Sequence, residues 1–400
     1  MFNIKSIPYL LFLLGFSYYC ILPIVFFAYA SDYIIMQRSM ARFYGADNGI
    51  EFFLYMAFIY FVLFSAGYYY TIKTKWFKFK VDKSPTKWQI FIITACYIVM
   101  AVLIVNIVEI LHPVGYTEGY NVIHRGQLTT LYLTSIWWYI YFKAEFQAKI
   151  MLLVVLISGL NLIVLGSRLG LISGIIALYV NNIFFKKNKF SDQNKREINL
   201  KKIILFVIIV FITMSIMGLL RSQDIISLEG ILSNAASESL YIYVSVPSYL
   251  SSTDLPYFSI PLDIFAGFIG SIPSYLFPEK VEFFSGMTCF KENSGSGFGG
   301  VHHIASLIAN FGLIGFPFVV FLEGMWFGFV VKNAQTSPFF RAVALLSMSV
   351  IPFILFRDGY QTSVKLLFAN FILIPYFAIQ AIWFMKLLMR WASMRDINIQ

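Results

Sequence analysis

Residues 150–185 have the sequence IMLLVVLISGLNLIVLGSRLGLISGIIALYVNNIFF, an apolar block interrupted by Gly166, Ser167 and Arg168. Each half approaches the ~20 residues that cross a bilayer as a helix. Because a backbone in lipid must satisfy its own hydrogen bonds, both halves are predicted to be helices. The short polar interruption predicts a tight helical hairpin with Arg168 at its tip.

Apolar runs of this kind recur along the whole chain. Hydrophobic residues make up 59% of the 400 residues, charged residues only 12%, and the mean hydropathy is +0.75. We therefore predict an all-α polytopic membrane protein, with residues 1–400 forming a single integral membrane domain. About ten spans are expected, at 8–30, 51–72, 88–110, 128–142, 150–166, 169–185, 203–220, 313–331, 339–356 and 363–386.

The first apolar run resembles a signal peptide, because Lys5 precedes it and the tripeptide Ala28-Tyr29-Ala30 closes it. The run from Pro8 to Ala30 is longer than the apolar core of a signal peptide and long enough to span a bilayer. We expect a retained first helix. The three cysteines build no disulfide framework, since the first two fall inside apolar spans.

The net charge of +10 reflects cations that cluster between apolar spans, so a nucleic-acid partner is not expected. If the N-terminus is cytoplasmic, 21 of the 30 basic residues fall on the inner side. The bias toward the inner side holds in every loop pair, which supports this topology. Arginine accounts for 6 of the 9 outer cations but only 4 of the 21 inner ones.

Arginine binds phosphate through a planar fork of N–H groups, which lysine lacks. Arg168, Arg221 and Arg357 all lie at outer helix ends, and they are predicted to share an anionic ligand. Alternatively, each arginine extends toward the interface or pairs with a neighbouring carboxylate.

The segment 221–303 is a long stretch without a clean apolar span, unlike the rest of the chain. A connection this long in a compact protein is usually functional or disordered, and its aromatic, proline and glycine content argues against disorder. Within it, 228–246 is predicted to form a helix. Residues 260–269 are apolar but too short to span, so they lie at the interface or pack on the bundle.

Three motifs follow one another along this loop and its exit: IPSYLFPEK at 272–280, the glycine-rich GSGFGG at 295–300, and Asn310-Phe311-Gly312 followed by Gly315. Together with the Gly-Ser-Arg tip and Arg357, their order resembles the O-antigen polymerase (Wzy) family over most of the chain. Members often have an acidic residue ahead of the Asn-Phe-Gly segment, where this chain has Ser306. The resemblance implies a glycosyltransferase C-like protein of the bacterial inner membrane, with the 221–303 loop and the active site facing the periplasm.

The resemblance further implies glycan transfer from a polyprenyl diphosphate-linked oligosaccharide to a sugar hydroxyl of another lipid-linked repeat unit. Membrane lipids and a chain-length regulator are the other candidate partners. Because the sequence contains no Asp-x-Asp motif, we expect no metal and no cofactor. Arginines would instead stabilise the departing diphosphate, each charged hydrogen bond contributing roughly 1.5–3 kcal/mol.

A base for the attacking hydroxyl should titrate near neutral pH, which favours His302 or His303. Alternatively, this pair caps the eighth helix; the spacing of the four histidines matches no metal-site pattern. Asp358 is expected to support Arg357. The predicted substrate-binding residues in the loop are Tyr241, Tyr275 and Lys280, with the tyrosines stacking on sugar rings.

Glu323 lies near the middle of the eighth span, where an acidic residue costs ~2.5–3.5 kcal/mol. It is expected to be paired or protonated, and structural pairing with a tyrosine or arginine is favoured over a functional role. Two alternative functions remain open. One is an O-antigen ligase, which passes the same donor to lipid A-core; the other is a flippase or transporter of lipid-linked glycan.

Overall fold

The computed structural model describes residues 7–29, 47–74, 86–105, 122–142, 146–164, 168–185, 255–272, 276–279, 301–334 and 336–397, with isolated positions between 205 and 249. Over this part of the chain 91% of the residues are helical and none lies in a strand. Six of the described helical segments are long and apolar enough to cross a membrane: Ile7–Val25, Glu51–Lys73, Lys87–Ile104, Phe146–Ile163, His303–Asn333 and Phe356–Met385. An all-helical, polytopic membrane architecture is thus supported, while the number ten stays a prediction.

The described elements are, in order, α1 (Ile7–Phe16), η2 (Ser17–Ile21), α2 (Leu22–Tyr29), α4 (Asp47–Lys73), α5 (Lys87–Ile104), α7 (Val122–Phe142), α8 (Phe146–Val164), α9 (Arg168–Phe185), α12 (Leu262–Gly270), α14 (His303–Asn333), α15 (Pro338–Val350), η5 (Ile351–Leu355), α16 (Phe356–Ser363), η6 (Val364–Leu373) and α17 (Ile374–Ile397). The η elements are π-helical. Helices α8 and α9 contact each other across a short connection, as the hairpin prediction requires. Most of the predicted span 203–220 lies outside the described residues.

Two helix starts follow directly from the sequence. Thr86 caps α5 by accepting a hydrogen bond from the backbone N–H of Gln89, and the Gln89 side chain accepts from the N–H of Thr86, at 2.8 Å. Ser337 caps α15 by accepting a hydrogen bond from the backbone N–H of Phe340, with Pro338 in the first turn. Serine or threonine before a helix, and proline just inside it, satisfy or remove N–H groups that have no intrahelical partner.

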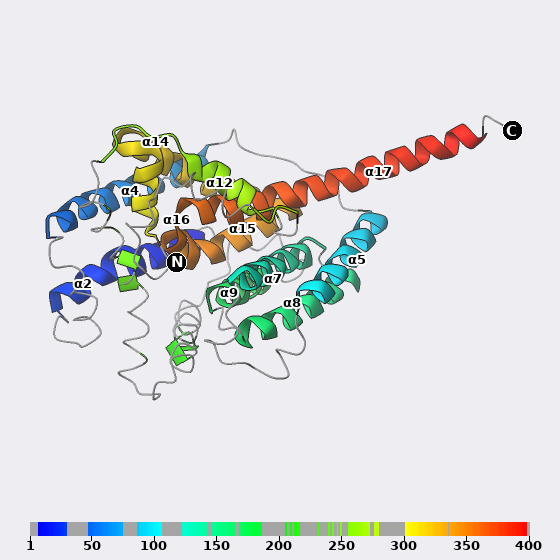
Figure 1. Ribbon diagram of the computed structural model, residues 1–400, viewed down its shortest axis with the longest axis horizontal. Helices are drawn as coiled ribbons and strands as arrows, with labels where there is room; N and C mark the ends of the chain where they lie inside the picture. The colour runs from blue at the N-terminus through cyan, green and yellow to red at the C-terminus, as the bar shows by residue number, and fades with distance from the viewer. Residues whose placement is uncertain are drawn as a thin grey trace.

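The helices form two groups that meet at α15 (Figure 1). Helices α5, α7, α8 and α9 pack against one another in the first group. The second group contains α1, α4, α14 and α16. Helix α15 contacts α7 and α9 on one side and α14 and α1 on the other, and its residues from Ala342 to Val350 are all buried. Helix α17 contacts α5 near its start, and its C-terminal end extends away from both groups (Figure 1).

Helices α4 and α14 form the most extensive contact between described elements. A Cβ atom on Gly324 would lie 2.1 Å from the carbonyl oxygen of Phe64, and one on Gly67 would lie 2.2 Å from that of Phe321. Gly328, one turn beyond Gly324, faces α4 in the same way. Small residues four apart allow two membrane helices to approach closely, so the backbones themselves make this interface.

Two glycines with positive φ break the C-terminal helices. Gly312 has φ 71° and ψ 176° inside α14, and Gly359 has φ 71° and ψ −175° inside α16. Side chains rarely tolerate this backbone conformation, which explains why glycine occupies both positions. The expectation that the eighth helix begins at 313 is therefore incomplete: α14 begins at His303 and bends at Gly312. Arg357 and Asp358, expected in a turn between spans, lie in α16 just before its break.

Helix α12 is the described part of the long loop that packs on the bundle. It contacts α16 and η6, and its buried face carries Asp263, Ala266 and Gly267. This agrees with the expectation that residues 260–269 pack on the bundle. Most of the segment 221–303 lies outside the described residues, although positions 239–240, 242–243 and 246 are helical and buried.

Candidate functional site

The end of the long loop is bonded to the break in α16. The N–H of Val301 donates to the carbonyl of Arg357 at 2.9 Å, and Val301 forms a parallel bridge with Asp358. One turn into α14, Ser306 Oγ accepts the N–H of Tyr360 at 2.9 Å. These bonds satisfy backbone groups freed by the break, and they bring His302 and His303 beside Arg357 and Asp358.

Arg357 and Asp358 form an ion pair, with Nη1 and Oδ1 separated by 3.0 Å. Their side chains are 28% and 24% exposed, so the pair is partly open to its surroundings. The carboxylate thereby holds the guanidinium in one orientation, and substrate binding by these two residues stays a prediction.

His302 is fully buried and caps α14. Its Nδ1 accepts the N–H of Ile304 at 3.2 Å, and its Nε2 lies 3.7 Å from Sγ of Cys20, within hydrogen-bond distance for sulfur. Phe53 packs edge-on against the ring. Burial, with a smaller contribution from His303, lowers the pKa of His302 from 6.5 to about 3. For His302 the structure shows the capping role that the sequence left as an alternative.

His303, the first residue of α14, pairs with Glu323 of the same helix. Its Nε2 lies 3.1 and 3.2 Å from the two carboxylate oxygens, and the ring is fully buried. A straight α-helix rises by a fixed step with each residue, so in an unbroken helix the side chains of His303 and Glu323 would be too far apart to touch. The break at Gly312 folds the first part of α14 back toward the second, and this makes the contact possible.

Glu323 has a second partner on α4. Tyr60 donates its hydroxyl proton to Oε2 at 3.2 Å. The expected pairing of Glu323 with a tyrosine is thus confirmed, whereas the pairing with His303 was not foreseen. The close approach of α4 and α14 at Gly67 and Gly324 brings Tyr60 within reach of the carboxylate. Gly324 and Gly328 form a Gly-x-x-x-Gly pattern, which in the sequence already indicates a closely packed pair of membrane helices.

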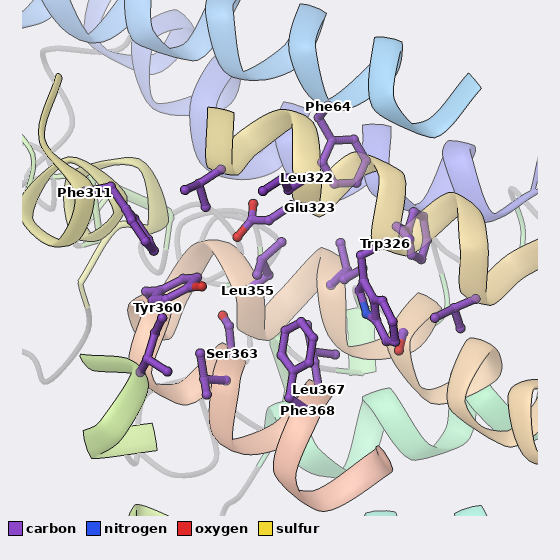
Figure 2. Close-up of a pocket in the computed structure, with 17 residues that line it drawn as sticks. Phe64, Phe311, Leu322, Glu323, Trp326, Leu355, Tyr360, Ser363, Leu367 and Phe368 are labelled. Atoms are coloured by element: carbon purple, nitrogen blue, oxygen red, sulfur yellow. The ribbon is translucent and has the colours of Figure 1, made fainter. Parts of the chain in front are cut away.

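A largely apolar cavity of about 390 Å³ lies beside this cluster. It opens between α14 and the run from η5 to η6, with α4, α12 and α15 contributing one residue each. Figure 2 shows the side-chain oxygens of Glu323, Tyr360 and Ser363 directed toward one another at one end. Phe368 and Trp326 line the other part of the wall. The cavity therefore combines a small polar end with an apolar body.

The Asn-Phe-Gly segment holds α12 in place beside this cavity. Asn310 is fully buried; its Nδ2 donates to Asp263 at 2.7 Å and to the carbonyl of Ser306 at 2.8 Å, and its Oδ1 accepts the N–H of Asp263 at 3.2 Å. After the break, the N–H of Leu313 donates to the carbonyl of Pro256 at 2.9 Å. The motif thus joins the loop to α14.

The other predicted site residues contribute less to this picture. Arg168 begins α9, but its side chain lies outside the described part of the structure. Arg221, Tyr241, Tyr275 and Lys280 lie outside the described residues altogether. Of the three arginines expected to converge, only Arg357 is described with its contacts.

No family model, no curated protein and no solved structure matches this chain. Among the described residues, no group of three His, Cys, Asp or Glu side chains is arranged to hold a metal ion.

Proposed function

We propose that this protein is a membrane glycosyltransferase that polymerises lipid-linked oligosaccharide repeat units. The observation that carries the proposal is the junction between the loop end at 301–306 and the break at Gly359. It gathers a buried histidine pair, an arginine–aspartate pair and an apolar cavity in one region. These are the groups needed for a proton acceptor, a diphosphate ligand and the tail of a lipid substrate.

In this proposal Arg357 binds the diphosphate of the donor. The acceptor hydroxyl attacks the anomeric carbon, and the bond from that carbon to the diphosphate oxygen breaks with its electron pair. Charge therefore accumulates on the leaving oxygen, where a guanidinium held by Asp358 would stabilise it. The hydroxyl proton passes to a histidine of the 302–303 pair. The resemblance to O-antigen polymerases favours the periplasmic face of the bacterial inner membrane for this chemistry.

Purified protein supplied with polyprenyl diphosphate-linked repeat units should produce a ladder of products that differ by one unit. Replacing the acceptor with lipid A-core separates polymerase from ligase, because a ligase then gives a single transfer product. Activity should persist in EDTA if arginine takes the place of a metal. Absence of any new glycosidic bond with either acceptor would refute the proposal.

One observation favours a second candidate, a transporter of lipid-linked glycan. Helices α14 and α16 are both broken at positive-φ glycines, and an ionisable pair, His303 and Glu323, joins the two parts of α14 across the first break. Discontinuous helices with such residues are common at transporter binding sites. Movement of intact lipid-linked glycan across sealed vesicles, without elongation, would select this function.

A further inference from the structure

The two adjacent histidines use their ring nitrogens differently. In His302, the lone pair of Nδ1 is engaged by the N–H of Ile304, at 3.2 Å. In His303, Nε2 faces the Glu323 carboxylate, while Nδ1 is buried with no hydrogen-bond partner among the described residues. A buried polar atom without a partner is destabilising and rare, so it points to a group that is absent from the free protein.

The carboxylate determines which nitrogen of His303 holds the proton. The ionised form of the Glu323 carboxylate only accepts hydrogen bonds, and beside it a neutral His303 ring holds its proton on Nε2. Nδ1 then carries the lone pair. A histidine whose tautomer and orientation are fixed by a carboxylate, and whose other nitrogen is available, is the arrangement that a general base requires.

We infer that Glu323 is the positioning residue for His303 in the transfer step, which assigns the proton-accepting role to Nδ1 of His303 rather than to His302. The inference rests on the proposed function. In the step itself, the acceptor O–H proton moves to Nδ1 as the new C–O bond forms at the anomeric carbon. The bond to the diphosphate breaks, and its electron pair leaves with the diphosphate. The carboxylate of Glu323 stabilises the imidazolium.

The surroundings of the pair fit this role. Tyr60 of α4 donates to Glu323, so the carboxylate is held from two sides. Tyr360 of α16 lies against the His303 ring, with the centroids 6.2 Å apart, and also lines the cavity. Catalytic hydrogen bonds often form only in the substrate complex, so the enclosed Nδ1 meets the hydroxyl when substrate binds at the loop end.

The kinetic test compares Glu323→Gln with Asn333→Ala in the ladder assay. The amide oxygen of glutamine can still accept a hydrogen bond from the Nε2–H group but carries no charge. Asn333 is a buried polar residue at the far end of α14. We expect Glu323→Gln to lower kcat by about 10²-fold or more with little change in KM, since the carboxylate acts in the transition state. Glu323→Asp, which keeps the charge, should recover part of the rate. Wild-type kcat in Glu323→Gln, with His303→Gln inactive, would overturn the inference and leave the proposed function standing.

A second measurement decides the tautomer without any substrate. The chain has only four histidines, so ¹⁵N-histidine labelling gives a simple NMR spectrum. The signals that disappear in the His303→Gln variant are those of His303. We expect Nε2 of His303 to be protonated and Nδ1 unprotonated at pH 8 in the wild-type protein. A protonated Nδ1 would overturn the inference even if polymer forms. A wild-type protein that makes no ladder would instead refute the proposed function.

Discussion

Replacing Gly324 by alanine should force α4 and α14 apart. The added Cβ would lie 2.1 Å from the carbonyl oxygen of Phe64, and 2.8 and 2.9 Å from its C and Cα atoms. Ordinary van der Waals contacts begin near 3.4 Å, so the two helices must separate locally. The obstacle is backbone, which cannot rotate away as the end of a flexible side chain can.

The cost of this separation has two parts. Forcing an extra methyl group into a packed interface costs about 1–3 kcal/mol, and a gap of roughly 0.5–1 Å already loses a quarter to a half of the dispersion attraction. The bond from Tyr60 to Glu323, now 3.2 Å long, would stretch. Losing that bond to a carboxylate oxygen costs roughly another 1.5 kcal/mol, so we expect a total of about 2.5–4.5 kcal/mol.

Thermal unfolding of the detergent-solubilised protein measures the effect. At roughly 2 °C per kcal/mol the midpoint of thermal unfolding should fall by about 5–9 °C. Gly126→Ala is the matched control, because a Cβ there meets nothing within 4 Å. Alanine should instead favour the helix at that position by up to ~1 kcal/mol. The double variant Gly67→Ala/Gly324→Ala should lose less stability than the sum of the losses in the two single variants, since both substitutions force the same separation of the helices.

An unchanged midpoint in Gly324→Ala would refute the close packing of α4 on α14. Additive losses in the double variant would show that the two glycines act at separate contacts. The unchanged midpoint would also remove the physical reason for placing Tyr60 beside Glu323.

Three further predictions follow from the same contacts. Asn310→Ala leaves a buried carboxylate at Asp263 without its amide donor, so we expect a loss of about 2–3 kcal/mol and faster proteolysis of the loop around α12; equal protease resistance would contradict this. Because burial lowers the pKa of His302 to about 3, the unfolded chain binds a proton below pH 6.5 that the folded chain does not. Stability should thus decline as the pH falls from 6.5 toward 3, and His302→Asn, which keeps a capping acceptor, should flatten that decline in unfolding midpoints; parallel curves would count against it. Arg357→Lys keeps the charge but loses the planar fork, so ladder formation should fall at least ~10-fold, whereas unchanged rates would argue against diphosphate binding there.

Much of the site depends on chain segments that are distant in the sequence. Sequence reasoning selected His302, His303, Arg357, Asp358 and Glu323 as residues of interest, because polar groups are rare in a chain this apolar. A tyrosine or arginine partner was expected for Glu323, and Tyr60 is that partner. It did not foresee that His303 would be the other partner, since several turns of helix normally separate two side chains widely.

The sequence by itself determined the class of protein and the approximate extents of most described helices, because apolar length and the need to satisfy backbone hydrogen bonds act locally. The α8–α9 hairpin and the cap at Thr86 follow from such local rules. Only the tertiary structure decided how α14 bends. Gly312 is one glycine among 25, and its positive φ is selected by the bonds that Pro256 and Tyr257 make to the N–H groups after it. That bend brings His303 to Glu323, and long-range packing rather than local propensity sets its direction.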